Sequence, residues 1–129
     1  MHGANEQVVK TFLEAFRERD MDKVRAQFAD GAVFHIAGNS PMAGEHSGPE
    51  AILSAFGKFR EETGDTWQAE MHDLLSTDEH VVALFIRTAT RNGNPGRFPA
   101  AVVYHLEGGK IADMWVHEQD LYAFDSFFS

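Results

Sequence analysis

Four strand-like segments in succession fill the second half of the chain. They span residues 66–75, 80–90, 97–106 and 110–119, are rich in β-branched and aromatic residues, and are separated by turn-forming residues. Helical patterns occupy most of the first half. Helices followed by a run of strands predict an α+β fold, with the helices gathered on one face of a mostly antiparallel sheet. Strands this long are expected to bend strongly around those helices rather than lie flat.

The first half contains three predicted helices. Apolar residues at helical spacing, among them Phe12 and Phe16, predict the first helix over residues 6–19. Asp20 is expected to cap a short second helix, and Pro49 is suited to the first position of the third. The pattern also predicts a strand over 32–37, a loop over 38–48 and a closing helix over 121–128.

The last two strands are predicted to form a hairpin, because Gly108-Gly109 can supply the positive φ values of a two-residue turn. That turn puts Leu106 opposite Ile111 and His105 opposite Ala112. One face of the hairpin then carries Val102, Tyr104, Leu106, Ile111, Asp113, Trp115 and His117. The other face carries Ala101, Val103, His105, Ala112, Met114, Val116 and Glu118.

Composition argues against several classes of function. A chain of 129 residues is expected to form one domain, residues 1–129, with one core. A net charge of −9 and eleven scattered basic residues disfavour nucleic acid and anionic membranes as partners. No cysteine is present and no apolar run approaches the ~20 residues that cross a bilayer, so we expect a cytoplasmic protein. Eleven Phe residues predict a large core, a subunit interface or an apolar cavity wall.

The order and spacing of several short motifs resemble the nuclear-transport-factor-2-like superfold, in particular its SnoaL-like and ketosteroid-isomerase-like branch. These motifs are DMD at 20–22, FADGAVFH at 28–35, GEHSGPEAI at 44–52 and GKI at 109–111. FHIAG at 34–38, SPMAG at 40–44 and MW at 114–115 further resemble small SnoaL-like proteins of unassigned function. The resemblance implies a cone-shaped roll with an internal pocket, and a homodimer. It does not imply one reaction, because this scaffold hosts enzymes and binding modules alike.

The residues that make ketosteroid isomerases catalytic are replaced in this chain. Those enzymes use an Asp base with a Tyr and a protonated Asp as hydrogen-bond donors, one of the established cases of pKa tuning. The resemblance carries the Tyr position onto Phe12, the base onto Ile36 and the second Asp onto the region of Val102. Phe has no hydroxyl, and neither Ile nor Val can transfer a proton. The isomerase mechanism is therefore not expected.

Three residues are candidates for proton transfer. His35 on the first strand could act as a general base, or could be a hydrogen-bonded structural histidine in an interface or beside the following loop. His105 and Glu118 could form an acid–base couple at the pocket mouth, although they lie at opposite ends of the predicted strand pairing. No histidine pair has the spacing of a helical zinc site and no phosphate-binding loop occurs, so neither a metal nor a cofactor is predicted.

An apolar pocket suits a small, largely apolar ligand. In catalytic relatives the polar group of the last strand falls at Met114 or Val116, which favours the second face of the hairpin as cavity wall, although the choice of face stays open. The predicted ligand-binding residues therefore come from both faces. They are Phe12, Phe16, Ile36, Phe56, Trp67, Met71, Leu84, Val103, Tyr104, Met114, Trp115 and Val116.

These observations leave three functional hypotheses. The first is a module that binds a small apolar ligand in an enclosed pocket, with any reaction undefined. The second is a SnoaL-like lyase, isomerase or cyclase that uses a His or Glu as general acid or base. The third is a dimeric scaffold whose pocket is filled by its own core.

Overall fold

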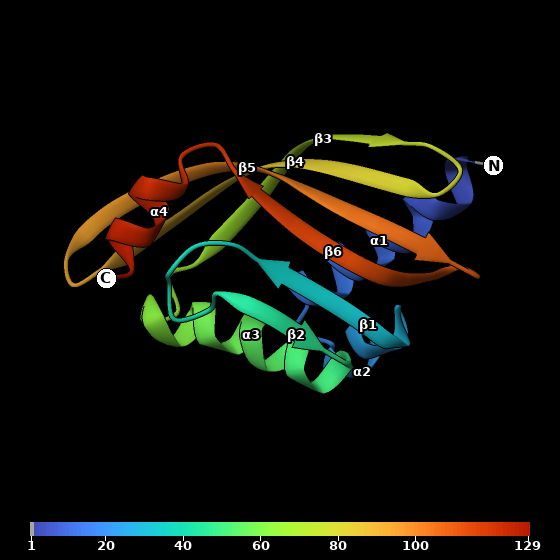
Figure 1. Cartoon of the computed structure of the whole chain (residues 1–129), viewed down its shortest axis with the longest axis horizontal. Helices are drawn as coiled ribbons and strands as arrows, with labels where there is room; N and C mark the ends of the chain where they lie inside the picture. Colours follow the sequence, from blue (N-terminus) through green and yellow to red (C-terminus); the bar gives the residue numbers. More distant parts are fainter. Residues whose placement is uncertain (1) are drawn as a thin grey trace.

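The computed structural model describes residues 2–129, and residues 3–129 with their side chains. Within this range a single curled, unclosed sheet of strands ordered β2-β1-β6-β5-β4-β3 wraps around helices on its inner side (Figure 1). The predicted α+β roll is confirmed. The elements are α1 (His2–Arg17), α2 (Met21–Ala26), β1 (Phe28–Ile36), β2 (Gly44–Ser47), α3 (Pro49–Glu62), β3 (Gln68–Ser76), β4 (His80–Arg91), β5 (Asn94–Glu107), β6 (Lys110–Glu118) and α4 (Leu121–Phe127).

Local sequence signals set the starts of three helices. The Asp20 carboxylate accepts a hydrogen bond from the backbone N–H of Lys23 at 3.2 Å and caps α2. Pro49 is the first residue of α3, as predicted, where its missing N–H costs nothing. Asp120 caps α4 by accepting from the backbone N–H of Ala123 at 3.0 Å. None of the described helices is long and apolar enough to cross a membrane.

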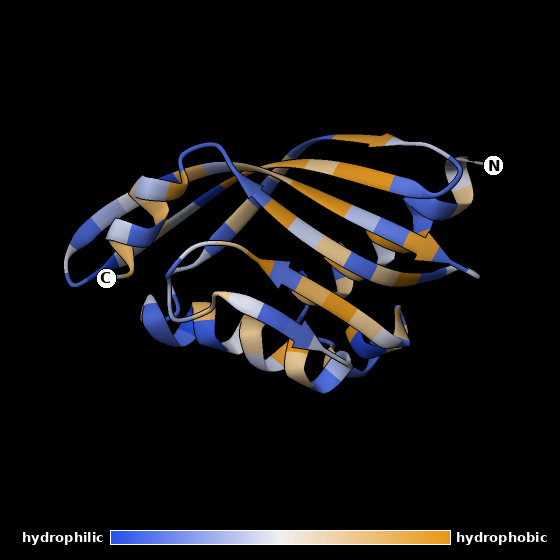
Figure 2. Ribbon diagram, in the orientation of Figure 1, coloured by the Kyte–Doolittle hydropathy of each residue, from blue (hydrophilic) through white to orange (hydrophobic). Residues whose placement is uncertain are grey.

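The sheet is mixed, because β1 pairs in parallel with β6 and every other neighbouring pair is antiparallel. Along β4 and the second half of β5 every second residue is buried, and these residues form the inner face against α1 and α3. Figure 2 shows hydrophobic and hydrophilic residues along the long strands. The alternation therefore divides the sheet into an apolar inner face and a half-exposed outer face.

The hairpin between β5 and β6 differs from its predicted register. Gly108 and Gly109 both have positive φ, and Leu106 lies opposite Ile111, as predicted. His105 lies opposite Asp113 instead of Ala112, because a β-bulge shifts the register between them.

The bulge has a packing cause. Ile111 and Met114 are three residues apart, so a regular strand would point them to opposite faces. One inserted residue allows both to be buried on the inner face, with exposed fractions of 0 % and 3 %. The predicted division of the hairpin into two faces is therefore wrong. Val102 and Tyr104 share the inner face with Met114 and Val116, which lie opposite them.

Further boundaries differ from prediction: α1 begins at His2 rather than at residue 6, and β1 begins at Phe28 rather than at residue 32. The predicted loop at 38–48 contains β2, which forms because its backbone pairs with the free edge of β1. The turn before β5 consists of Asn92-Gly93, both with positive φ, so β5 begins at Asn94 rather than at the predicted residue 97. Asn-Gly is the sequence that most favours such a two-residue turn.

An aromatic cluster closes the far end of the inner face. Phe124 and Phe128 of the C-terminal segment are buried and pack against Phe59, Trp67 and Phe98. Figure 1 shows α4 beside the end of the β4–β5 hairpin. The short C-terminal helix thus covers one end of the core that the sheet alone would leave open.

Candidate functional site

A pocket lies between the inner face of the sheet and helices α1 and α3. Its cavity volume is about 100 Å³. Ala69 on the edge strand β3 is exposed and Trp67 is half-buried, so the pocket opens beside that edge. The lining residues are Phe12, Leu13, Phe16, Phe34, Phe56, Phe59, Trp67, Ala69, Phe85, Arg87, Val102, Tyr104, Met114 and Val116.

The structure gathers a majority of the predicted ligand-binding residues at this pocket. Those in the lining are Phe12, Phe16, Phe56, Trp67, Tyr104, Met114 and Val116. Their rings contact one another closely: Phe16 and Phe56, for example, meet edge to face with centroids 4.9 Å apart. The pocket wall and the hydrophobic core are therefore continuous.

The other predicted ligand-binding residues lie elsewhere. Ile36 is buried on the inner face opposite Val116 but outside the lining. Met71 is on the edge strand β3 with 36 % of its surface exposed. Leu84, Val103 and Trp115 lie on the outer face, because they alternate with inward residues along β4, β5 and β6.

The sequence did not single out Arg87, although it lines the pocket. Arg87 is only 5 % exposed and follows the buried Phe85 at strand spacing, so its position in the alternation was the available signal. The Nε–H donates to the backbone carbonyl of Phe98 at 3.1 Å, and Nη2 donates to the Glu118 carboxylate. The guanidinium also lies 5.3 Å from the ring centroid of Trp67 and 5.4 Å from that of Phe124. These contacts fix the cation at the edge of the pocket.

Glu118 is the one predicted catalytic residue whose side chain lies on the inner face. The side chains of Glu118 and Arg87 are each 6 % exposed, so they form a buried ion pair. Burial raises the pKa of the Glu118 carboxyl above its ordinary value, and Arg87 offsets only part of that rise. The Asp125 charge on α4 raises the same pKa further. A carboxyl in this environment can hold a proton at a higher pH than an exposed one.

Asp125 lies close to this ion pair, in a tightly packed part of the structure. Its Oδ1 atom is buried and accepts no hydrogen bond from the residues that the structure describes. A Cβ at Gly38 would lie 2.5 Å from that oxygen, so only glycine allows the loop after β1 to pass α4 this closely. The loop and α4 thereby enclose the Arg87–Glu118 end of the inner face.

His35 lies on the outer face, away from the pocket. Its Nδ1 is 2.9 Å from Oε2 of Glu45, and its Nε2 is 3.0 Å from Oδ1 of Asp113. Its ring stacks on Trp115, with centroids 5.0 Å apart and planes within 6°. Both ring nitrogens and one ring face are therefore occupied, which leaves His35 little capacity to act on a ligand.

The predicted couple of His105 and Glu118 is not brought together. His105 lies on the outer face beside His80, with ring centroids 4.9 Å apart, and its Nε2 is 3.6 Å from Glu107. Glu118 pairs with Ala100 on the inner face. The two side chains therefore project from opposite sides of the sheet.

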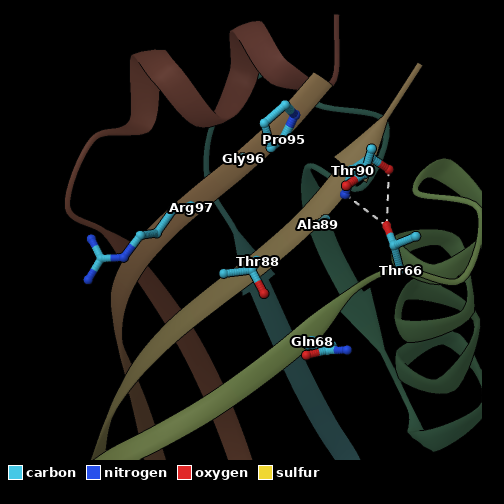
Figure 3. Close-up of a pocket in the computed structure, with 8 residues that line it drawn as sticks. All are labelled: Thr66, Gln68, Thr88, Ala89, Thr90, Pro95, Gly96 and Arg97. Carbon is cyan, nitrogen blue, oxygen red and sulfur yellow. Dashed lines mark hydrogen bonds between the residues drawn. The ribbon is translucent and has the colours of Figure 1, made fainter. Parts of the chain in front are cut away.

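A second, more open hollow of about 640 Å³ lies at the far end of strands β3, β4 and β5 (Figure 3). Thr66 spans the strand ends there: its Oγ1 donates to the Thr90 carbonyl at 3.0 Å and accepts from the Thr90 N–H at 2.8 Å. The hollow is larger than the inner pocket, but six of its eight wall residues are exposed, and most of these are polar. A ligand there would lose little contact with water, so the inner pocket is the stronger candidate site.

The described residues contain no group of three His, Asp or Glu side chains placed to hold a metal ion. The chemistry that the inner pocket can offer comes from its aromatic wall and from the few polar groups in its lining.

Comparison with known proteins relates most of the chain to one family. The model of the SnoaL-like domain family matches residues 9–114. Bal32a, from a soil-derived mobile gene cassette, has a solved structure that is 32 % identical, with 99 % of this chain and 98 % of that chain covered and a TM-score of 0.94. No curated protein matches the sequence.

Two less similar solved structures share the fold. A putative SnoaL-like polyketide cyclase from Jannaschia sp. CCS1 is 17 % identical, with a TM-score of 0.81 over 100 % of this chain and 94 % of that one. TerC, co-crystallised with polyporic acid, is 16 % identical, with a TM-score of 0.85 over 97 % of this chain and 98 % of that one.

Proposed function

This chain belongs to the SnoaL-like domain family, and we propose on that basis that its inner pocket binds one small, largely apolar molecule. The observation that carries the proposal is the pocket itself, walled by aromatic rings from two helices, from strands β1, β4 and β5, and from Trp67 just before β3. Pockets that bind small molecules combine such a wall with a few well-placed polar groups. Arg87, Tyr104 and the indole nitrogen of Trp67 are the polar groups of this lining.

The size of the cavity limits the ligand. A dry cavity of about 150 Å³ binds benzene, and the volume here is about 100 Å³. We therefore expect a ligand of one ring or a short chain, with larger molecules admitted only when the mouth beside β3 widens. Two proteins of the same fold support a small-molecule role by their names: one is a putative polyketide cyclase, and the other was co-crystallised with polyporic acid.

Filling the pocket should abolish binding. Val102→Phe adds a phenyl ring on the inner face, whereas Val103→Phe adds the same ring one residue along, on the outer face. We expect Val102→Phe to weaken benzene binding by at least tenfold and Val103→Phe to leave it unchanged, since an occupied cavity cannot admit the ligand.

The binding measurement can use the chain's own fluorescence. Of the two Trp residues, Trp67 lines the pocket and Trp115 lies outside it. In a Trp115→Phe background, emission from Trp67 therefore reports directly on the pocket during titration with benzene. Equal affinity in Val102→Phe and Val103→Phe would place the ligand elsewhere, and no binding to any variant would reject the proposal.

We also propose that the chain forms a homodimer, as the family resemblance implies. The outer face supports this, because Val82, Leu84, Val103 and Trp115 are only half-buried there in the single chain. A two-fold pair would bury the same patch on both copies. Size-exclusion chromatography with light scattering should give twice the chain mass of 14.4 kDa, and a species of the chain mass would contradict the dimer.

Proton transfer is the second candidate function, and one observation favours it. Glu118 is buried with a raised pKa against Arg87, which reaches the pocket lining. Perturbed titratable groups of this kind cluster at functional sites. Among the three predicted catalytic residues Glu118 therefore stays a candidate acid or base, and His35 and His105 are less suited by their outer-face positions.

A further inference from the structure

We infer that the ligand carries an uncharged oxygen acceptor, such as a ketone or ether, and that the hydroxyl of Tyr104 donates a hydrogen bond to it inside the pocket. This inference rests on the proposed function and adds to it the chemical class of the ligand and a residue that selects it. Tyr104 lies on β5 and forms part of the pocket wall.

Tyr104 is a buried residue, 1 % exposed, and its hydroxyl makes no hydrogen bond with the described residues. The hydroxyl oxygen keeps a small accessible surface, as expected for an atom at the pocket wall. Buried tyrosine hydroxyls normally have a hydrogen-bond partner, and one left unpaired is costly. Phe12 meets the Tyr104 ring edge to face with centroids 6.1 Å apart, and its ring supplies no acceptor. The pocket interior is therefore the place from which a partner can come.

The hydroxyl serves as a donor and stays neutral. Burial raises the pKa of the Tyr104 hydroxyl well above its ordinary value, since a phenolate would have to lose its hydration. A neutral phenol in an apolar site donates to carbonyl, ether or hydroxyl oxygens. The nearest neighbours of Tyr104 on the inner face are Met114 opposite it and Val102 two residues along β5, and neither side chain has a donor.

The charges around the pocket disfavour an anionic ligand. Arg87 is the cation of the lining, and its Nη2 already donates to the carboxylate of Glu118. Asp125 adds a further negative charge beside that pair. A ligand carboxylate would therefore meet a neutralised guanidinium and a nearby negative charge, and it would lose its hydration on entering an apolar wall. An uncharged acceptor avoids both penalties.

Two isosteric probes test this inference. Cyclopentanone and methylenecyclopentane have the same ring and the same number of heavy atoms, and only the ketone accepts a hydrogen bond. We expect Tyr104→Phe to weaken cyclopentanone binding by roughly three- to tenfold, the range for one lost hydrogen bond, and to leave methylenecyclopentane binding unchanged. Tyr122→Phe is the matched control, because Tyr122 is the other tyrosine of the chain and is 84 % exposed.

A spectroscopic signature of the wild-type protein gives an independent result. The carbonyl stretch of bound cyclopentanone should shift to lower frequency than in a hydrocarbon solvent, and the shift should vanish in Tyr104→Phe. The anionic probe cyclobutanecarboxylate should bind at least tenfold more weakly than cyclopentanone, in line with the cost of burying an unpaired charge.

The outcomes separate this inference from the proposed function. Suppose that both ring probes bind to the wild-type protein. If Tyr104→Phe then weakens the binding of both probes equally, or weakens the binding of neither, the proposed role of the hydroxyl is wrong, although the pocket still binds ligands. Tighter binding of cyclobutanecarboxylate than of cyclopentanone would overturn the uncharged class. If neither ring probe binds to the wild-type protein, the proposed function fails together with the inference.

Discussion

Replacing Arg87 with alanine is expected to lower the free energy of unfolding by about 3–5 kcal/mol, the range for removing one partner of a buried ion pair. The Glu118 carboxyl would be left buried without its cation and would take up a proton. The carbonyl of Phe98 would lose a donor, and the rings of Trp67 and Phe124 would each lose their contact with the guanidinium. Chemical denaturation followed by circular dichroism measures the change.

A control variant and a double variant test whether the loss of stability in Arg87→Ala comes from the buried ion pair. Arg97→Ala removes an exposed arginine from the neighbouring strand β5 and should change the free energy of unfolding by less than about 0.5 kcal/mol. The double variant Arg87→Met, Glu118→Leu should recover most of the loss, because apolar residues often replace a buried pair without cost. A double variant as unstable as Arg87→Ala would show that the stacking contacts matter more than the charge pair.

Phe12→Ala is the second substitution with a large expected effect, a loss of about 3–5 kcal/mol in the free energy of unfolding. Phe12 is 3 % exposed, and its ring contacts those of Phe28, Phe56 and Tyr104. Removing the ring leaves a void that joins the existing pocket, and surrounding side chains can close it only in part.

Benzene should restore part of the stability lost in Phe12→Ala, because it replaces the deleted phenyl ring. A ligand at one hundred times its dissociation constant stabilises a protein by about 2.7 kcal/mol. Thermal unfolding with and without benzene measures the effect, with Tyr122→Ala at an exposed site as the control. A benzene effect no larger in Phe12→Ala than in the wild-type protein would contradict the continuity of core and pocket.

The functional groups of the pocket were only partly predictable. The sequence predicts Tyr104 as a ligand-binding residue, but the predicted hairpin pairing places Met114 on the opposite face. The bulge at Ala112 brings Met114 opposite Tyr104 on one face. The sequence pattern does not indicate Arg87, because a charged residue in a strand ordinarily faces solvent.

Pairing across the sheet explains why the ion pair could not be predicted. Arg87 is on β4 and Glu118 on β6, with β5 between them. Nothing local in either segment indicates the partner in the other. Their contact depends on the long reach of the arginine side chain and on the register of two successive strand pairs, which a one-residue bulge changes.

The sequence alone determined the order of the elements apart from β2, the cap at Asp20, the glycine turn before β6 and the family to which the chain belongs. Each of these depends on local periodicity, on backbone conformation or on short motifs in a fixed order. The tertiary structure alone decided which face of the last hairpin encloses the pocket, and that Arg87 meets Glu118 there. These depend on how buried side chains across the whole inner face pack together, and that packing sets the strand registers.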